Sequence, residues 1–176
     1  DYYERETPRI SARQEKLLKD VLYALFEERG YFRGSPTAPP PTFSEVVERL
    51  ERVEETPEVK TALLNKLVDF CRGTKGRIFN GPSNVSYDDL SSGLVVIDLT
   101  RLTWDERLAR LLVFVILKLI YTAAKAAGPT EGFRHLIVIE EAPSIIAARS
   151  PVVSILLSMM REMRKYGEGF ILVARS

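Results

Sequence analysis

Apolar residues in the N-terminal part of the chain recur every three or four positions, which is the spacing of amphipathic α-helices. Ser11 with Gln14, and Thr42 with Glu45, have the spacing of capping boxes, in which each side chain caps the other residue's backbone N–H. Pro57 suits the first turn of a third helix, where its missing N–H costs nothing. The pattern therefore predicts three helices in this part of the chain.

Two features delimit these helices. A proline-rich stretch, residues 35–41, cannot form regular structure and separates the first helix from the second. Gly73 and Gly76 are expected to end the third helix, because glycine is a poor helix former. We therefore expect an N-terminal all-α lobe over residues 1–75.

The pattern changes in residues 76–176, where short continuous apolar runs replace the helical spacing. Such runs, rich in β-branched residues, are typical of strands buried on both faces of a parallel sheet. Three strands are expected, at residues 94–99, 136–139 and 169–173.

Two helical patterns connect the expected strands. Thr103 and Glu106 have capping-box spacing before an apolar stretch that runs to about Ala127, and a second helix runs from Ser150 to a stop at Gly167. Strands that alternate with helices predict an α/β fold, a parallel sheet with helical crossovers. We expect helices on both faces of the sheet, because no strand alternates polar and apolar positions.

Composition narrows the classes of function. The formal net charge is +1, with 45% hydrophobic and 28% charged residues, which is typical of a globular domain and argues against a generally basic surface that coats nucleic acid. Cys71 is the only cysteine and His135 the only histidine. These counts exclude an internal disulfide and metal sites built from Cys or His clusters, and they disfavour a Ser-His-Asp triad.

Other features of the sequence bear on location and source. No signal peptide is visible, and the longest apolar run, residues 111–117, is far too short to cross a bilayer, so we expect a cytoplasmic protein without a membrane span. The chain begins at Asp1 rather than methionine, which indicates a segment of a longer protein. Glu, Lys and Arg are plentiful while Gln and Asn are scarce, a bias that favours a thermophilic source.

Candidate chemistry follows the second expected strand, where Glu140 and Glu141 are adjacent. In open parallel sheets, ligands bind beyond the carboxyl ends of the strands. Two neighbouring carboxylates are costly to bury together, and a divalent cation removes that cost: one carboxylate holds Mg²⁺ and the other orients a water molecule. The alternative is that both glutamates are solvated loop residues.

A family resemblance bears on this choice. The segment LIVIEEA, residues 136–142, resembles the Walker B strand of HerA/FtsK-like ATPases, a class that includes HerA-type DNA translocases and the ATPases of type IV secretion and conjugation. GRIFNGPSNVSYDDLSSGLVVIDLTRL, residues 76–102, is similar to the stretch before that strand in secretion-type members. REMRKYGEGFILVARS, residues 161–176, resembles the helix and sensor strand that follow. The resemblance implies a partial RecA-like core at 76–176, with residues 1–75 as the all-α lobe that these proteins insert before Walker B.

The resemblance also implies roles for individual residues. Glu140, where many relatives have aspartate, corresponds to the carboxylate that holds Mg²⁺, here through water, and Glu141 to the one that activates the attacking water. ATP and Mg²⁺ are the implied cofactors. Arg175 stands where relatives often place a polar sensor of the γ-phosphate, commonly glutamine; it is either that sensor or a surface arginine.

Arg161 and Arg164 lie in the last turns of an expected helix. One interpretation is that they complement the partial negative charge of the helix C-terminus, as Lys165 does. The other is that one of them reaches the nucleotide of a neighbouring subunit as an arginine finger.

The sequence contains no G-x-x-x-x-G-K-[ST] phosphate loop, and the nearest string, residues 73–76, lacks its length and its terminal Lys-Ser/Thr pair. We therefore expect that this chain alone does not hydrolyse ATP, and that an upstream segment of the same protein supplies the loop. The resemblance implies a homo-hexameric motor that moves DNA or a secreted protein. The alternative is a non-catalytic ATPase-like or helical module that binds a partner protein.

Overall fold

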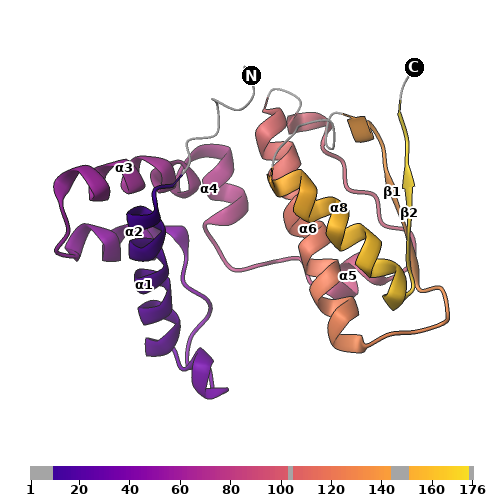
Figure 1. Ribbon diagram of the computed structural model, residues 1–176, viewed down its shortest axis with the longest axis horizontal. Coiled ribbons are helices and arrows are strands. Elements are labelled where there is room, and N and C mark those ends of the chain that lie inside the picture. The colour runs from indigo at the N-terminus through magenta and orange to yellow at the C-terminus, as the bar shows by residue number, and fades with distance from the viewer. Residues whose placement is uncertain (1–9, 103–104, 144–150, 175–176) are drawn as a thin grey trace. The chain divides into compact units, whose positions relative to one another are not determined.

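A computed structural model of the chain describes residues 10–102, 105–143 and 151–174. The chain divides into two compact units (Figure 1). The first, Pro8–Asn84, is called the helical unit; the second, which includes Val85–Ser176, is called the α/β unit.

Four α-helices and two short 3-10 helices form the described part of the helical unit (Figure 1). They are α1 (Ala12–Glu28), η2 (Tyr31–Arg33), α2 (Phe43–Arg52), α3 (Pro57–Leu67), η3 (Val68–Cys71) and α4 (Gly73–Phe79). Both capping boxes expected in this unit are confirmed. The hydroxyls of Ser11 and Thr42 each accept from the backbone N–H three residues on, and their own backbone N–H groups donate to the side chains of Gln14 and Glu45 in return. The leucines and valines that α1, α2 and α3 turn toward one another form the core, in which Leu50 and Leu63 are fully buried.

The expected end of the third helix at Gly73 and Gly76 is wrong. A 3-10 turn follows α3, and both glycines then lie inside α4. Gly76 is needed for packing there: a Cβ at this position would lie 2.6 Å from the carbonyl carbon of Cys71. Glycine in this segment therefore permits close contact between η3 and α4 and does not terminate a helix.

The α/β unit contains two strands and two longer helices among its described residues (Figure 1). Its elements are α5 (Tyr87–Ser91), η4 (Thr100–Leu102), α6 (Glu106–Ala127), β1 (His135–Ile139), α8 (Pro151–Met163), η5 (Arg164–Tyr166) and β2 (Glu168–Leu172). Thr103, the expected cap of the long helix, lies outside the described residues, and α6 begins at Glu106. The Asp105 side chain accepts from the N–H of Leu108 and starts α6, because an aspartate directly before the first turn caps as well as threonine does.

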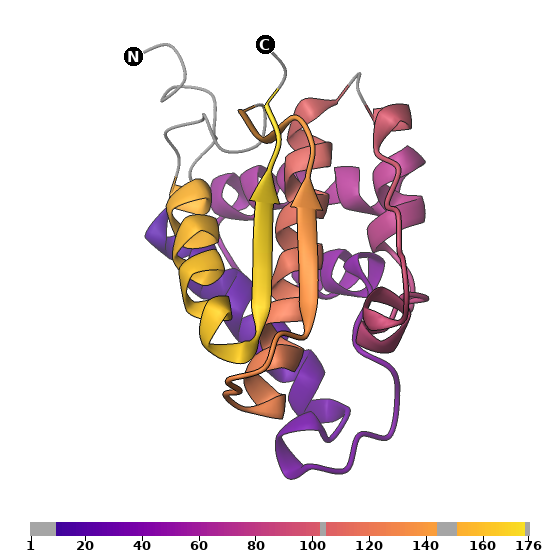
Figure 2. The same cartoon turned by 90° about the vertical axis from the view of Figure 1, so that its right-hand side faces the viewer.

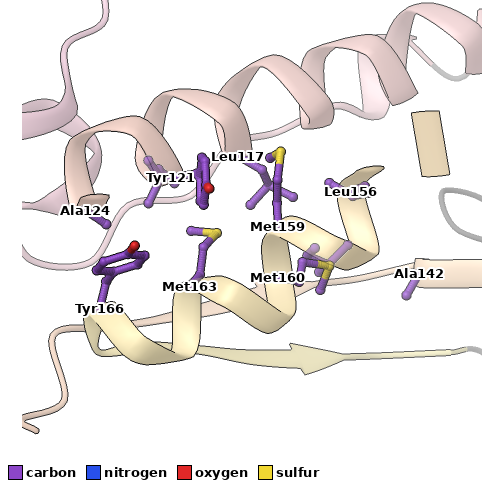
Figure 3. Packing of buried hydrophobic residues seen from close by; sticks show 11 residues of the cluster. Leu117, Tyr121, Ala124, Ala142, Leu156, Met159, Met160, Met163 and Tyr166 are labelled. Carbon is purple, nitrogen blue, oxygen red and sulfur yellow. The ribbon is translucent and has the colours of Figure 1, made fainter. Parts of the chain in front are cut away.

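The two strands run parallel, from the pair His135–Glu168 to the pair Ile139–Leu172 (Figure 2). Helix α8 lies in the connection between them, as expected for a parallel pair. Side chains from α6 and α8 pack together with the inward side chains of the strands (Figure 3). The centre of this core is Met163, which is fully buried. An α/β fold with a parallel sheet and a helical crossover is therefore confirmed.

The expected strand at 94–99 is wrong: these residues form no strand. Leu94 is 95% exposed and Val96 81%. The Asp98 carboxylate accepts from the backbone and the hydroxyl of Thr100, a local turn that ends the extended stretch. An apolar run favours a strand, but a strand also needs backbone hydrogen bonds to a neighbouring strand. Residues 94–99 form no such hydrogen bonds with the described strands.

The expected covering of both sheet faces is also wrong for the described residues. Helices α6 and α8 lie on one face, toward which Ile137 and Ile139 point. Leu136 and Val138 point the other way and are 51% and 53% exposed. Within the described ranges, no helix is long and apolar enough to cross a membrane.

Candidate active site

The turn that follows β1 carries the two glutamates and is clamped onto β2. The N–H of Val173 donates to the carbonyl of Ile139, and the N–H of Ala142 donates to the carbonyl of Val173, each at 2.9 Å. Glu140 and Glu141 lie between these bonds and are exposed. The pair therefore directly follows the carboxyl end of β1, and the two strands end side by side at this edge (Figure 2), where ligands bind in open α/β sheets.

Glu141 has an unusual backbone conformation. Its φ of 54° makes it the one residue other than glycine with positive φ in the described part of the chain. The left-handed region costs a residue that has a Cβ about 1–2 kcal/mol. Such strain persists where surrounding structure over-determines it, and it concentrates at functional sites. Here the two backbone bonds to Val173 hold the turn in place.

The carboxylates provide few ligands for a metal ion. The described residues contain no group of three or more His, Cys, Asp or Glu side chains that could hold a metal. Zinc or calcium held mainly by protein ligands does not fit this arrangement. Mg²⁺ does fit, because it is commonly held by one or two carboxylates and takes its other ligands from water and phosphate oxygens. The solvated-loop interpretation also agrees with the exposure of both side chains.

Arg161 and Arg164 lie at the other end of the sheet. They line a shallow surface depression together with Phe133 and with Gly167 and Glu168, where β2 begins. A strand of five residues separates this end from the glutamates, about 16 Å at 3.3 Å per residue. Both arginines are exposed. The structure thus does not bring them together with Glu140 and Glu141 in one subunit. Arg175 lies outside the described residues.

A hydrogen-bonded pair of side chains at the amino ends of the strands, His135 and the fully buried Glu168, was not anticipated. Nδ1 of His135 lies 2.9 and 3.1 Å from the two carboxylate oxygens of Glu168, whose side chain is fully buried. The ring of Tyr87 meets the His135 ring edge-on at 5.9 Å. Burial, and then the nearby Glu168 charge, raise the pKa of Tyr87. The sequence places a glutamate between two glycines here but gives no sign of the register that pairs it with His135.

A second polar cluster joins α6 to α8. The Tyr121 hydroxyl donates to Glu162 at 2.7 Å, the Tyr166 hydroxyl donates to the same carboxylate at 3.4 Å, and Lys125 lies 3.6 Å from it. The hydrogen bond from Tyr121, followed by the Lys125 charge, lowers the pKa of Glu162. The cluster lies at the end of α8 that carries Arg161, directly before η5, which carries Arg164.

Comparison with known proteins gives a match in fold. No protein-family model and no curated protein matches the chain. A solved structure, VirB4 of Thermoanaerobacter pseudethanolicus, superposes with a TM-score of 0.74 over 98% of the chain, at 22% sequence identity. The chain has the fold of VirB4.

The VirB4 match has a defined extent. It covers almost the whole chain, so it is not confined to residues 76–176, on which the sequence resemblance rests. The chain spans 47% of the VirB4 chain, about half its length. At 22% identity the match shows a shared fold, and what the residues of the site do rests on their own geometry.

Proposed function

We propose that this chain is part of an ATP-hydrolysing motor of the HerA/FtsK-like class, related to type IV secretion ATPases, and contributes the Walker B half of its nucleotide site. The observation that carries the proposal is the strained Glu141 at the carboxyl end of a parallel strand, clamped to the next strand at Val173. The VirB4 fold of the chain supports it. In this proposal the RecA-like core comprises residues 76–176, and residues 1–75 form the inserted helical lobe.

Glu140 and Glu141 have different roles in the proposed site. Glu140 would hold Mg²⁺ through water, and a bound ion would supply the positive charge that offsets the phosphates of ATP. The Glu141 carboxylate orients the attacking water and accepts its proton. Arg175 follows the clamped segment of β2 in sequence and is the proposed γ-phosphate sensor. The phosphates themselves are gripped by a phosphate loop from another segment of a longer polypeptide.

Because the arginines and the glutamates lie at opposite ends of the sheet, the proposed site requires an assembly of several subunits. An arginine at the amino end of the sheet acts on a nucleotide only when that nucleotide belongs to a neighbouring subunit. Repeated head-to-tail contact between unlike ends closes a ring, and a homo-hexamer is the ring proposed here. A motor of this kind works where ATP is supplied, so the proposal places the protein in the cytoplasm. Its cargo is DNA or a secreted protein.

The first experiment replaces Glu141 with Gln in a polypeptide that includes a phosphate loop. ATP turnover should fall roughly 100- to 10,000-fold, the usual contribution of a positioned base, while Mg²⁺-ATP binding measured by calorimetry is retained. Glu48→Gln is the matched control, an exposed glutamate of the helical unit whose replacement should leave turnover unchanged. Wild-type turnover in Glu141→Gln would refute the assigned base. Absence of any nucleotide binding in the wild-type polypeptide would favour the non-catalytic module.

A second experiment tests whether the arginines act between subunits. Glu141→Gln subunits and Arg164→Ala subunits, each inactive alone, should regain part of the turnover when mixed before assembly, because some interfaces then combine an intact base with an intact finger. The same mixture with Arg161→Ala tests the other candidate. Mixtures that stay inactive at every ratio would contradict an arginine finger supplied in trans.

A further inference from the structure

The connection between α1 and α2 concentrates proline (Figure 1). Four of the ten prolines in the chain fall within residues 36–41, three of them consecutively at positions 39–41. Proline fixes its own φ at about −65°, and its ring excludes the residue before it from the helical region. Residues 38–40 each precede a proline, so the sequence restricts them to extended or polyproline II conformations. We call residues 35–41 the proline segment.

The proline segment is open to solvent. Every residue from 35 to 40 is exposed, and burial begins only at Pro41, just before Thr42 caps α2. Proline has no backbone N–H, so positions 39–41 cannot extend a helix or join the edge of a β-sheet by a full set of backbone hydrogen bonds. The groups that the segment presents to a partner are therefore proline rings and backbone carbonyls.

Three hydrogen bonds hold the segment against the end of α1 and against η2. The N–H of Thr37 donates to the carbonyl of Arg29 at 2.9 Å, and the Arg29 guanidinium donates in turn to the carbonyl of Pro39 at 2.6 Å. The Tyr31 hydroxyl donates to the carbonyl of Ala38 at 3.1 Å. The segment is thus ordered in the free chain, which reduces the conformational entropy lost when a partner binds.

An exposed pair of aromatic rings borders the segment. The rings of Tyr23 on α1 and Phe32 on η2 stack with 4.6 Å between their centres, and each residue is 56% exposed. Phe32 is next in sequence to Tyr31, whose hydroxyl bonds the segment at Ala38. Aromatic side chains are enriched where proteins dock, because each buries a large apolar area. Prolines that only stiffen a connection do not account for two large rings left in solvent.

We propose that the proline segment, together with the stacked rings of Tyr23 and Phe32, is a docking surface for a partner protein that has an aromatic-lined, proline-binding groove. Such grooves bind segments that already have polyproline II geometry and pack aromatic rings against the prolines. Residues 34–44 contain no charged side chain, so the segment offers no cation to the phosphates of a nucleic acid or of a membrane surface. The missing N–H groups disfavour addition of the segment to a partner's sheet.

The docking surface is independent of the proposed nucleotide site. It belongs to the helical unit, whereas Glu140 and Glu141 belong to the α/β unit. Binding of the partner is measured without nucleotide, so the result does not depend on ATP hydrolysis. A failure of the motor proposal leaves the docking surface intact, and a failure of the docking surface leaves the motor proposal intact.

The test titrates the 176-residue chain with two purified probes, an SH3 domain and a WW domain, and measures binding by calorimetry. At least one probe should bind. Replacing both Pro39 and Pro40 with alanine should weaken that binding about tenfold, because each alanine restores backbone freedom. Pro82→Ala is the control, since Pro82 is an exposed proline of the same unit outside the segment, and it should leave the affinity unchanged.

A synthetic peptide of residues 33–42 measures what the fold adds to the sequence of the segment. The folded chain should bind the same probe at least about threefold more tightly than the peptide, because the segment is already ordered and the aromatic pair adds contact. Phe32→Ala should remove part of this advantage. Phe32 is exposed, so the midpoint of urea unfolding of Phe32→Ala should stay near that of the wild type.

Several outcomes would overturn the proposal. They are the absence of binding by both probes, equal losses in Pro82→Ala and in the double variant, and a peptide that binds as tightly as the folded chain. If light scattering shows a wild-type dimer that the double variant loses, the segment joins two copies of this chain, and the proposed partner is wrong. Pro40→Ala alone should weaken binding about threefold, which keeps the test valid if the double variant unfolds.

Discussion

The hydroxyl of Tyr121 on α6 donates a 2.7 Å hydrogen bond to the carboxylate of Glu162 on α8, 41 residues away in sequence. The bond lies at the edge of the core in which Tyr121 and Met163 are buried (Figure 3). It fixes the rotation of α8 about its own axis relative to α6. That rotation determines where the neighbouring Arg161 and Arg164 project.

Tyr121→Phe should therefore lower the midpoint of urea unfolding at neutral pH. The bond lowers the pKa of Glu162, so the stabilisation is fully present above the unfolded value near 4.5 and is lost as pH falls through the lower folded value. The difference between wild type and Tyr121→Phe should accordingly shrink below pH 4.5. Tyr23→Phe is the control, because its ring is exposed and its hydroxyl has no hydrogen-bond partner among the described residues. A difference that stays constant with pH would contradict this account.

A second prediction concerns the free energy of unfolding of variants in the pair formed by His135 and Glu168. His135→Leu leaves a fully buried carboxylate without its partner and should reduce the free energy of unfolding by about 3 kcal/mol. Replacing both residues with leucine removes the unpaired charge as well, so the double variant should recover most of that loss. Chemical denaturation of the wild type, both single variants and the double variant measures the coupling. If the double variant were less stable than His135→Leu, the cost of His135→Leu could not be attributed to an unpaired buried carboxylate, and this account would be wrong.

The capping boxes of the helical unit and the two strands could be predicted from the sequence, because both depend on local patterns. Ser11 with Gln14, and Thr42 with Glu45, interact over three residues, so the local sequence contains both partners of each bond. Glu140 and Glu141 were placed at the end of a parallel strand by the same kind of local pattern. What each carboxylate does remains a prediction.

Features that depend on distant partners could not be predicted. The run at 94–99 has the composition of a strand but pairs with neither described strand, and His135 meets Glu168 through a register that only the assembled sheet defines. The sequence predicts that Gly76 ends a helix, whereas in the structure its lack of a Cβ permits close contact with the backbone of Cys71. The neighbours that decide the first two features are distant in sequence, whereas Gly76 meets nearby Cys71 only because η3 and α4 fold back on each other.

Gly76→Ala tests that contact directly. The added methyl group would meet the backbone of Cys71, which cannot move away as a flexible side chain would, so we expect a loss of about 1–3 kcal/mol in the free energy of unfolding. Gly81→Ala is the matched control, because a Cβ there meets nothing within 4 Å. A loss at Gly81 equal to that at Gly76 would exclude the close contact as the cause.

The strain at Glu141 predicts a change in which stability and activity move in opposite directions. Asparagine tolerates positive φ better than glutamate, so Glu141→Asn should raise the free energy of unfolding of the 176-residue chain by about 1 kcal/mol. In a polypeptide that includes a phosphate loop, the same change should abolish turnover, because the shorter amide neither reaches the water nor accepts its proton. Glu140→Asn also removes one charge but does not relieve a positive φ, so its stability should not rise. A stability gain equal at both positions would mean that charge repulsion, and not backbone strain, is stored in this turn.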